Sequence, residues 1–176
     1  MRITFILPYV GMSGGNRVTG IYADQLQRRG HQVALFSTRP RRNTLRQSVR
    51  LISQMRFNEI GFSQQPSYLD DLDLEWHINP RYGPWPERDL PDADVIIAAW
   101  WETACWVRDY SDEKGSKMYF MQDYGTGSQS LKNIVPTWKF GMPMVTVSKW
   151  LKGLVLEHAP GSRVRVVENG VDRSLF

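Results

Sequence analysis

Cysteine is almost absent from this sequence. Cys105 stands alone among 176 residues, so no internal disulfide can form. Histidine is nearly as scarce, and the three histidines, His31, His77 and His158, do not have the spacing of a metal-ligating motif. We therefore expect neither a disulfide scaffold nor a bound metal.

Long apolar runs are also lacking. A membrane-spanning helix needs about 20 consecutive apolar residues, and no segment approaches that length. The apolar start of the chain is broken at Pro8, which is too early for the apolar region of a signal peptide. The sequence predicts a cytoplasmic protein, with peripheral contact at the inner face of the plasma membrane as an open alternative.

Composition excludes disordered and fibrous classes, because 41% of the residues are hydrophobic and 23% are charged. A length of 176 residues suits one domain, so we expect a single domain over residues 1–176.

The net charge of +4 is modest, but five arginines gather in one short stretch. They are Arg39, Arg41, Arg42, Arg46 and Arg50. Such a stretch is suited to an anionic membrane, to phosphate groups of a substrate, or simply to solvent as the outer face of a helix. No aromatic residue lies among the arginines, so a nucleic acid is not an expected partner.

Short apolar segments alternate with segments of helical spacing along the chain. The predicted strands are residues 3–7, 33–36, 74–78, 95–98, 117–121, 145–147 and 164–167. The predicted helices run from residue 16 to a C-cap at Gly30, over 44–55, over 103–108, and over 149–158 after an N-cap at Ser148. This alternation predicts an α/β domain with a Rossmann-like, doubly wound, mostly parallel sheet.

Ligands of such sheets bind outside the carboxyl ends of the strands. Three segments are expected there: Gly11–Asn16 after the first strand, the polar and aromatic residues after the strands at 95–98 and 117–121, and the turn 168–172. Small residues in the first segment would allow backbone N–H groups to approach a phosphate or a sugar hydroxyl.

A nicotinamide-dependent oxidoreductase is one alternative for a glycine-rich first turn. The spacing here is Gly-x-x-Gly-Gly, however, and the second strand ends in Ser37-Thr38-Arg39, where a dinucleotide-binding domain would place an acid. A non-enzymatic α/β binding module is a second alternative, and it would bind its ligand without a further domain.

A set of short motifs in this order resembles the amino-terminal domain of family 4 retaining glycosyltransferases, which have two Rossmann-like domains (GT-B). The motifs are the first strand with Pro8, Gly14-Gly15, the Leu26-to-Val33 junction around Gly30-His31, Ala93-Asp94-Val95, Val147-Ser148, and Asn169-Gly170-Val171-Asp172 with Phe176. Residues 118–124 are most similar to rhamnosyltransferase-like members of that family.

The resemblance implies a division of labour between two domains. This chain would hold the acceptor, a saccharide or lipid-linked saccharide of polysaccharide or glycolipid synthesis. A carboxy-terminal domain outside it would hold the nucleoside diphosphate sugar. Asn169, Gly170 and Asp172 would form the hinge between them, and no cofactor beyond the donor sugar is implied. The isolated domain is expected to be inactive.

The resemblance also assigns roles to individual residues. Gly14, Gly15 and Asn16 match the loop beside the donor diphosphate and acceptor, although a simple β-α turn explains them equally well. Gln122 stands where many relatives have a histidine, and it can position a sugar hydroxyl but cannot titrate. Asp123 is the candidate catalytic residue, as proton or hydrogen-bond acceptor from the acceptor hydroxyl, or else a turn cap.

Aromatic residues complete the candidate acceptor site. Trp101 and Tyr124 have rings that can stack on sugars, and of the adjacent Trp100 and Trp101 we expect one to be exposed. Glu102 is a candidate acceptor of sugar hydroxyls, or else a carboxylate at a helix start.

Overall fold

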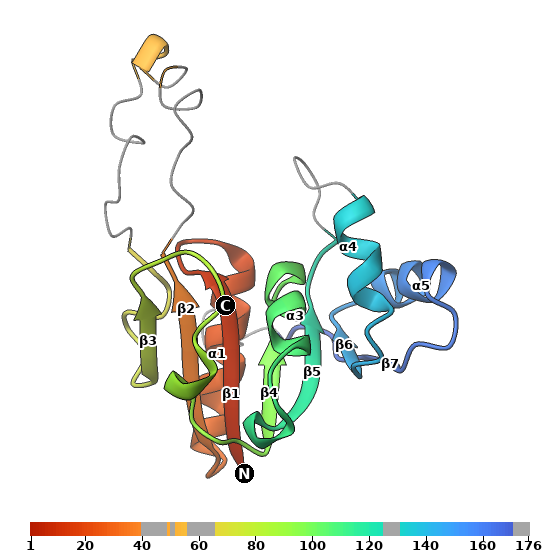
Figure 1. The fold of residues 1–176 in the computed structure, drawn as a ribbon, viewed down its shortest axis with the longest axis horizontal. Coiled ribbons are helices and arrows are strands. Elements are labelled where there is room, and N and C mark those ends of the chain that lie inside the picture. The colour runs from red at the N-terminus through yellow and green to blue at the C-terminus, as the bar shows by residue number, and fades with distance from the viewer. Residues whose placement is uncertain (40–48, 50–51, 56–65, 125–130, 171–176) are drawn as a thin grey trace.

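The computed structural model describes residues 1–39, 49, 52–55, 66–124 and 131–170 of the chain. Within these residues, seven parallel strands form one sheet with the order β3-β2-β1-β4-β5-β6-β7 (Figure 1). The strands are β1 (Arg2–Tyr9), β2 (Gln32–Thr38), β3 (Glu75–Asn79), β4 (Val95–Ala98), β5 (Ser116–Met121), β6 (Met144–Thr146) and β7 (Val164–Val166). The helices are α1 (Gly14–Arg28), α3 (Trp101–Arg108), α4 (Leu131–Trp138) and α5 (Lys149–His158), with short 3-10 turns η2 (Glu87–Asp89) and η3 (Asp112–Lys114).

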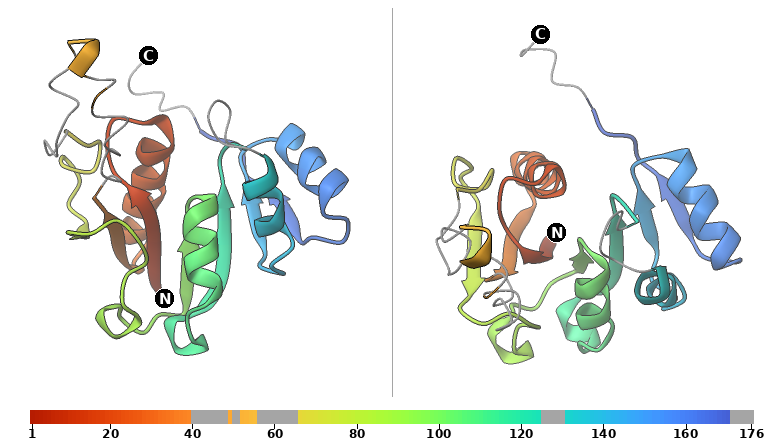
Figure 2. Two further views of the ribbon diagram at one scale, coloured as in Figure 1. Left: turned by 45° about the horizontal axis from the view of Figure 1, so that its top comes forward. Right: turned by 90° about the horizontal axis from the view of Figure 1, so that it is seen from above.

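Helices cover both faces of the sheet, which confirms the predicted doubly wound α/β fold. Seen from above, α1 lies on one side of the strands while α3 and α4 lie on the other (Figure 2). Ala23 of α1 packs with Phe5 and Leu35, whereas Ala104 of α3 belongs to a second buried cluster with Ile6. Because β1 and β4 are central and buried on both faces, they appear in the sequence as continuous apolar runs.

Helix α1 begins at Gly14, two residues before the predicted start. The hydroxyl of Ser13 accepts a hydrogen bond from the N–H of Asn16 (3.2 Å), which caps the first turn. Two poor helix formers at positions 14 and 15 conceal this start in the sequence.

The end of α1 confirms the predicted role of Gly30. Its N–H donates to the carbonyl of Gln27 (2.9 Å), and His31 N–H donates to the carbonyl of Leu26 (3.2 Å), the two bonds of a Schellman turn. Gly30 has φ 85°, a conformation that glycine adopts without strain.

Helix α4 was not predicted. Its Ile134 and Trp138 are only 1% exposed and belong to the core under β5 and β6, at the spacing of one helix face. Pro136 in the middle of the segment hides the helix, since proline removes one backbone donor. Most of the predicted helix 44–55 lies outside the described residues; within it, 49, 52 and 53 are helical.

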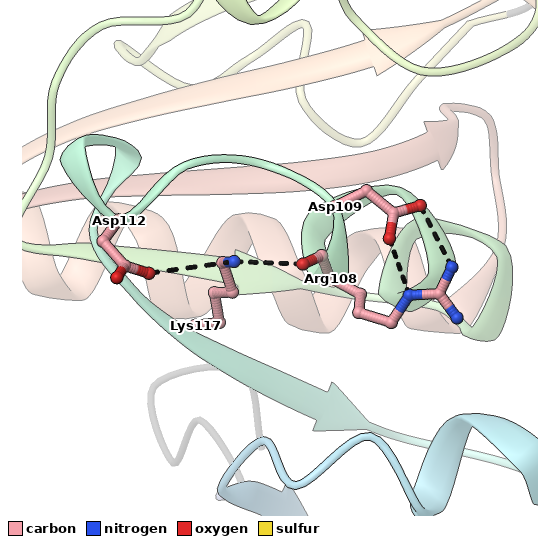
Figure 3. A network of polar contacts seen from close by, with 4 residues as sticks. All are labelled: Arg108, Asp109, Asp112 and Lys117. Carbon is pink, nitrogen blue, oxygen red and sulfur yellow. Dashed lines mark hydrogen bonds and ion pairs between the residues drawn. The ribbon is translucent and has the colours of Figure 1, made fainter.

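A polar network joins the end of α3 to the start of β5 (Figure 3). Lys117 donates to the backbone carbonyl of Arg108 (3.0 Å) and lies 3.9 Å from Asp112. The guanidinium of Arg108 forms two hydrogen bonds with Asp109 (2.7 and 3.1 Å). Because Arg108 and Asp109 are well exposed, their pair contributes little to stability.

Candidate functional site

The predicted site residues lie along the edge of the sheet formed by the carboxyl ends of the strands. The β1 end leads into Gly14 and Gly15, the β4 end into Trp101, and the β5 end into Gln122 and Asp123. Strands β1, β4 and β5 are neighbours in the sheet. From β1 the chain adds β2 and β3 on one side, then crosses back and adds β4 and the later strands on the other side, so the order of the strands reverses between β1 and β4. This reversal is the position where doubly wound sheets form their ligand crevice.

Gln122 connects the end of β5 to the first turns of α1. Its Nε2 donates to the carbonyl of Gly15 (3.1 Å) and to the hydroxyl of Thr19 (2.9 Å). The Thr19 hydroxyl in turn donates to the carbonyl of Gly15 (2.9 Å), so the three groups close a small network. The amide of Gln122 therefore holds the glycine turn in place, a role that the sequence did not predict.

Neither Gly14 nor Gly15 is required by local packing. A Cβ at Gly14 would meet no atom within 4 Å, and a Cβ at Gly15 would lie 3.8 Å from Gln122, an ordinary contact. Neither has the positive φ that favours glycine. Alanine would be the better helix former at both positions, so the fold alone does not explain two glycines here.

The side chain of Asn16 is committed to the loop before α1. Its Nδ2 donates to the carbonyls of Tyr9 (3.2 Å) and Gly11 (3.4 Å), and the residue is 7% exposed. These bonds fix the shape of the first β-α turn.

Helix α3 begins at the end of β4. The hydroxyl of Thr103 accepts from the N–H of Trp100 (3.0 Å) and donates to its carbonyl (2.9 Å). The expectation that one of the adjacent tryptophans is exposed is wrong: Trp100 and Trp101 are both half-buried, because Trp101 packs on the α3 side of the core. Its Nε1 is buried without a partner in the described part of the chain. Glu102 follows, also half-buried.

After β5, Asp123 is exposed and Tyr124 is half-buried. The ring of Tyr124 meets Trp150 in an edge-to-face arrangement, with centroids 5.1 Å apart and an interplanar angle of 71°. Trp150 was not among the predicted site residues, and the ring contact brings it to the same edge. The sequence does indicate that Trp150 is exposed, because it lies two residues after the Ser148 N-cap, where the helix pattern does not place it on the core face.

Burial raises the pKa of the Tyr119 phenol in β5, which is completely enclosed, so this hydroxyl stays protonated. Burial likewise raises the pKa of the Cys105 thiol on α3. Both groups are therefore neutral at physiological pH. No group of histidine, cysteine or acidic side chains in the described residues is arranged to hold a metal ion.

The remaining predicted residues lie elsewhere or outside the described part of the chain. Asn169 and Gly170 follow β7 and are exposed, while Asp172 lies outside the described residues. Arg39 is exposed at the end of β2, and the other four arginines of that stretch also fall outside the described residues. No helix in the described ranges is long and apolar enough to cross a membrane.

A hollow of about 540 Å³ lies at the opposite edge of the sheet, lined by Arg2, Gln27, His31 and Asp92 among others. None of the predicted site residues lines it. Arg2 is already paired there with Asp94 (3.5 Å), so we place the candidate site at the carboxyl edge.

The Gln122 network yields a first testable prediction. In Gln122→Glu a carboxylate replaces the donor amide and faces the carbonyl of Gly15. We expect the free energy of unfolding at pH 7 to fall by about 1–2 kcal/mol, because the donor is lost. At pH 4 the protonated carboxyl donates again, and part of the loss is recovered.

Urea denaturation of the variant and of the wild type at both pH values measures this difference. Gln32→Glu, at an exposed position that begins β2, serves as the control and should show little change. A deficit that is the same at both pH values would contradict the donor role of Gln122.

No family model matches this sequence, and no curated protein sequence matches it. Solved structures do match. A glycosyltransferase from Rickettsia africae ESF-5 superposes with a TM-score of 0.51 at 15% identity. This chain shares the α/β fold of one part of that enzyme. The match covers 97% of this chain and 43% of that enzyme.

Two further structures with this glycosyltransferase fold are of an alpha-glucosyltransferase. One is a complex with UDP and a 13-mer DNA containing an HMU base, with a TM-score of 0.54 and 13% identity over 100% of this chain. The other is a complex with UDP-glucose and DNA containing an abasic site, with a TM-score of 0.50 and 13% identity over 96%. The present chain spans less than half the length of each of these proteins, at 45% and 42%.

Proposed function

We propose that this chain is the acceptor-side half of a glycosyltransferase that transfers a sugar from a nucleoside diphosphate sugar to an acceptor hydroxyl. The observation that carries the proposal is the pair Gly14-Gly15 at the switch point of the sheet. Local packing requires neither glycine, and both lie at the start of α1, on the edge where doubly wound sheets bind their ligands.

The glycosyltransferase fold of the matched structures supports the proposal, as does their length. Each matched protein is more than twice as long as the part that superposes on this chain. The donor-binding half is therefore proposed to lie in a second domain that follows a hinge at Asn169, Gly170 and Asp172. The family 4, retaining, rhamnosyltransferase-like assignment is part of this proposal.

Asp123 is the proposed acceptor of the proton or hydrogen bond from the attacking hydroxyl. Its exposed position directly after β5 makes it accessible to a ligand at the carboxyl edge, and Gln122 beside it keeps the first turn of α1 in place. Stabilisation of the leaving diphosphate, which accounts for much of the lowering of the activation barrier, would come mainly from the other domain. The 176-residue chain alone is therefore proposed to bind an acceptor without transferring sugar, and no cofactor or metal is proposed.

We propose a saccharide or a lipid-linked saccharide as acceptor, in polysaccharide or glycolipid synthesis. Two of the matched structures contain DNA, but the exposed Asp123 at the proposed site disfavours a phosphate backbone. A cytoplasmic location, with the arginines of the 39–50 stretch at an anionic membrane surface, belongs to the same proposal.

A ligand-observed NMR screen of this chain tests the proposal. The ligands are UDP-glucose, NAD⁺, NADP⁺ and methyl glycosides of glucose, galactose, mannose and rhamnose. We expect saturation transfer to at least one glycoside and weak binding of UDP-glucose. We expect no binding of NAD⁺ or NADP⁺. Tight binding of NAD⁺ or NADP⁺ would instead establish the oxidoreductase alternative.

A further inference from the structure

Two aromatic rings meet at the carboxyl edge of the sheet without belonging to the same element. Tyr124 follows β5, and Trp150 lies in the first turn of α5, which follows β6. Strands β5 and β6 are paired neighbours, with Met121 opposite Thr146, so their two following segments emerge side by side. The ring centroids are 5.1 Å apart.

The indole of Trp150 is largely exposed to solvent. Trp150 is 59% exposed and belongs to neither buried cluster. Tryptophan is highly buried on average in folded proteins, so an indole with this much exposed surface is unusual. Tyr124, by contrast, packs against the core and supports the exposed ring.

Rigid structure holds Trp150 in this position. The hydroxyl of Ser148 accepts from the N–H of Leu151 (3.1 Å) and fixes the first turn of α5. Leu151 is 3% exposed and anchors that turn in the core. The backbone that carries Trp150 is therefore fixed, and the contact with Tyr124 orients the ring, which lowers the entropic cost of binding a ligand.

The neighbouring charge favours one kind of ligand. Asp123, directly before Tyr124, is an exposed carboxylate, and an ionised carboxylate only accepts hydrogen bonds. An aromatic face attracts the weakly positive C–H groups on one face of a pyranose, while a carboxylate accepts from its hydroxyls. Lys149 is exposed on the same turn, so a single-stranded nucleic acid is the competing ligand that the experiment must exclude.

We propose that the exposed indole of Trp150, supported by the edge-to-face contact with Tyr124, forms a stacking platform for a pyranose ring of the acceptor, with Asp123 accepting hydrogen bonds from its hydroxyls. This assignment rests on the acceptor-side function proposed above and narrows it. The acceptor presents a sugar ring, not a lipid or a protein side chain, to the edge between β5 and β6.

Two-dimensional ¹H–¹⁵N spectra of the wild-type chain and of Trp150→Ala test the platform. The indole N–H signal that the variant lacks identifies Trp150. We expect titration with the methyl glycosides to shift that signal in the wild type. In Trp150→Ala, glycoside affinity should be about 3- to 10-fold weaker, with partial recovery in Trp150→Phe.

Leu156→Ala, at an exposed position near the other end of α5, is the matched control and should keep wild-type glycoside affinity. Unfolding curves of all variants show whether α5 stays folded. If Trp150→Ala misfolds, the shift of the Trp150 indole signal in the wild type and the glycoside affinity of Trp150→Phe decide the test. A titration with oligo(dT) tests whether the chain binds single-stranded nucleic acid instead of a saccharide.

Each outcome has one meaning. Glycoside binding that neither shifts the Trp150 signal nor weakens in Trp150→Ala overturns the platform but leaves the acceptor-side function intact. A wild-type chain that binds none of the glycosides overturns both. Tighter binding of oligo(dT) than of every glycoside overturns the saccharide assignment in favour of nucleic acid.

Discussion

Trp138→Ala is expected to lower the free energy of unfolding by about 3–5 kcal/mol, the cost of removing a large buried aromatic side chain. Trp138 is 1% exposed and lies at the end of α4, where it packs in the cluster that also contains Met144 and Val155. The cavity that the substitution leaves cannot collapse easily, because its walls come from β6 and α5 as well as α4. Urea denaturation followed by circular dichroism measures the change.

Trp150→Ala provides the matched control, because it removes the same side chain from an exposed position. We expect its effect on stability to stay below about 0.5 kcal/mol. Equal losses in the two variants would mean that the described burial of α4 is wrong.

Gly115→Ala is expected to cost about 3 kcal/mol for a different reason, since the backbone itself is incompatible with a side chain. Gly115 has φ 106°, and a Cβ there would lie 2.8 Å from the nitrogen of Val95 and 3.0 Å from the carbonyl oxygen of Ala93. The first atom belongs to β4 and the second to the segment just before it, so relief would require shifting the start of a central strand. Thermal and urea unfolding measure the loss.

Gly153→Ala is the control for this substitution. Gly153 lies exposed within α5, and a Cβ would meet no atom within 4 Å. Alanine should therefore stabilise the protein by about 0.5–1 kcal/mol. Two Gly→Ala changes of opposite sign would establish that position, not residue type, decides the effect.

Much of this fold was predictable because parallel strands buried on both faces appear as short apolar runs. All seven predicted strands occur, with ends that differ by no more than two residues, and α5 begins after its predicted Ser148 cap. Helix α4 was missed because Pro136 interrupts its pattern. Glycines likewise hid the start of α1, where a hydrogen bond from Asn16 to Ser13 outweighs weak helix propensity.

The candidate site was predictable only to the level of segments. A parallel sheet places every strand's carboxyl end at one edge, so Gly14, Gly15, Gln122 and Asp123 could be assigned to that edge from the sequence alone. What each side chain does there depends on contacts between distant segments. The bond from Gln122 to Gly15 spans 107 residues, and the meeting of Tyr124 with Trp150 depends on the pairing of β5 with β6. No local pattern encodes either.

The outermost strands of the sheet bear on how this chain behaves at high concentration. Strand β7 at one border has three residues and carries Arg165 at its centre, while β3 at the other has the exposed Glu75 and His77, whose side chains are in hydrogen-bond contact at 2.9 Å. Short, charged borders offer a poor template for strand addition by another molecule. The strongly apolar β1 and β4 are kept at the centre, so self-association into fibrils would first require the sheet to open.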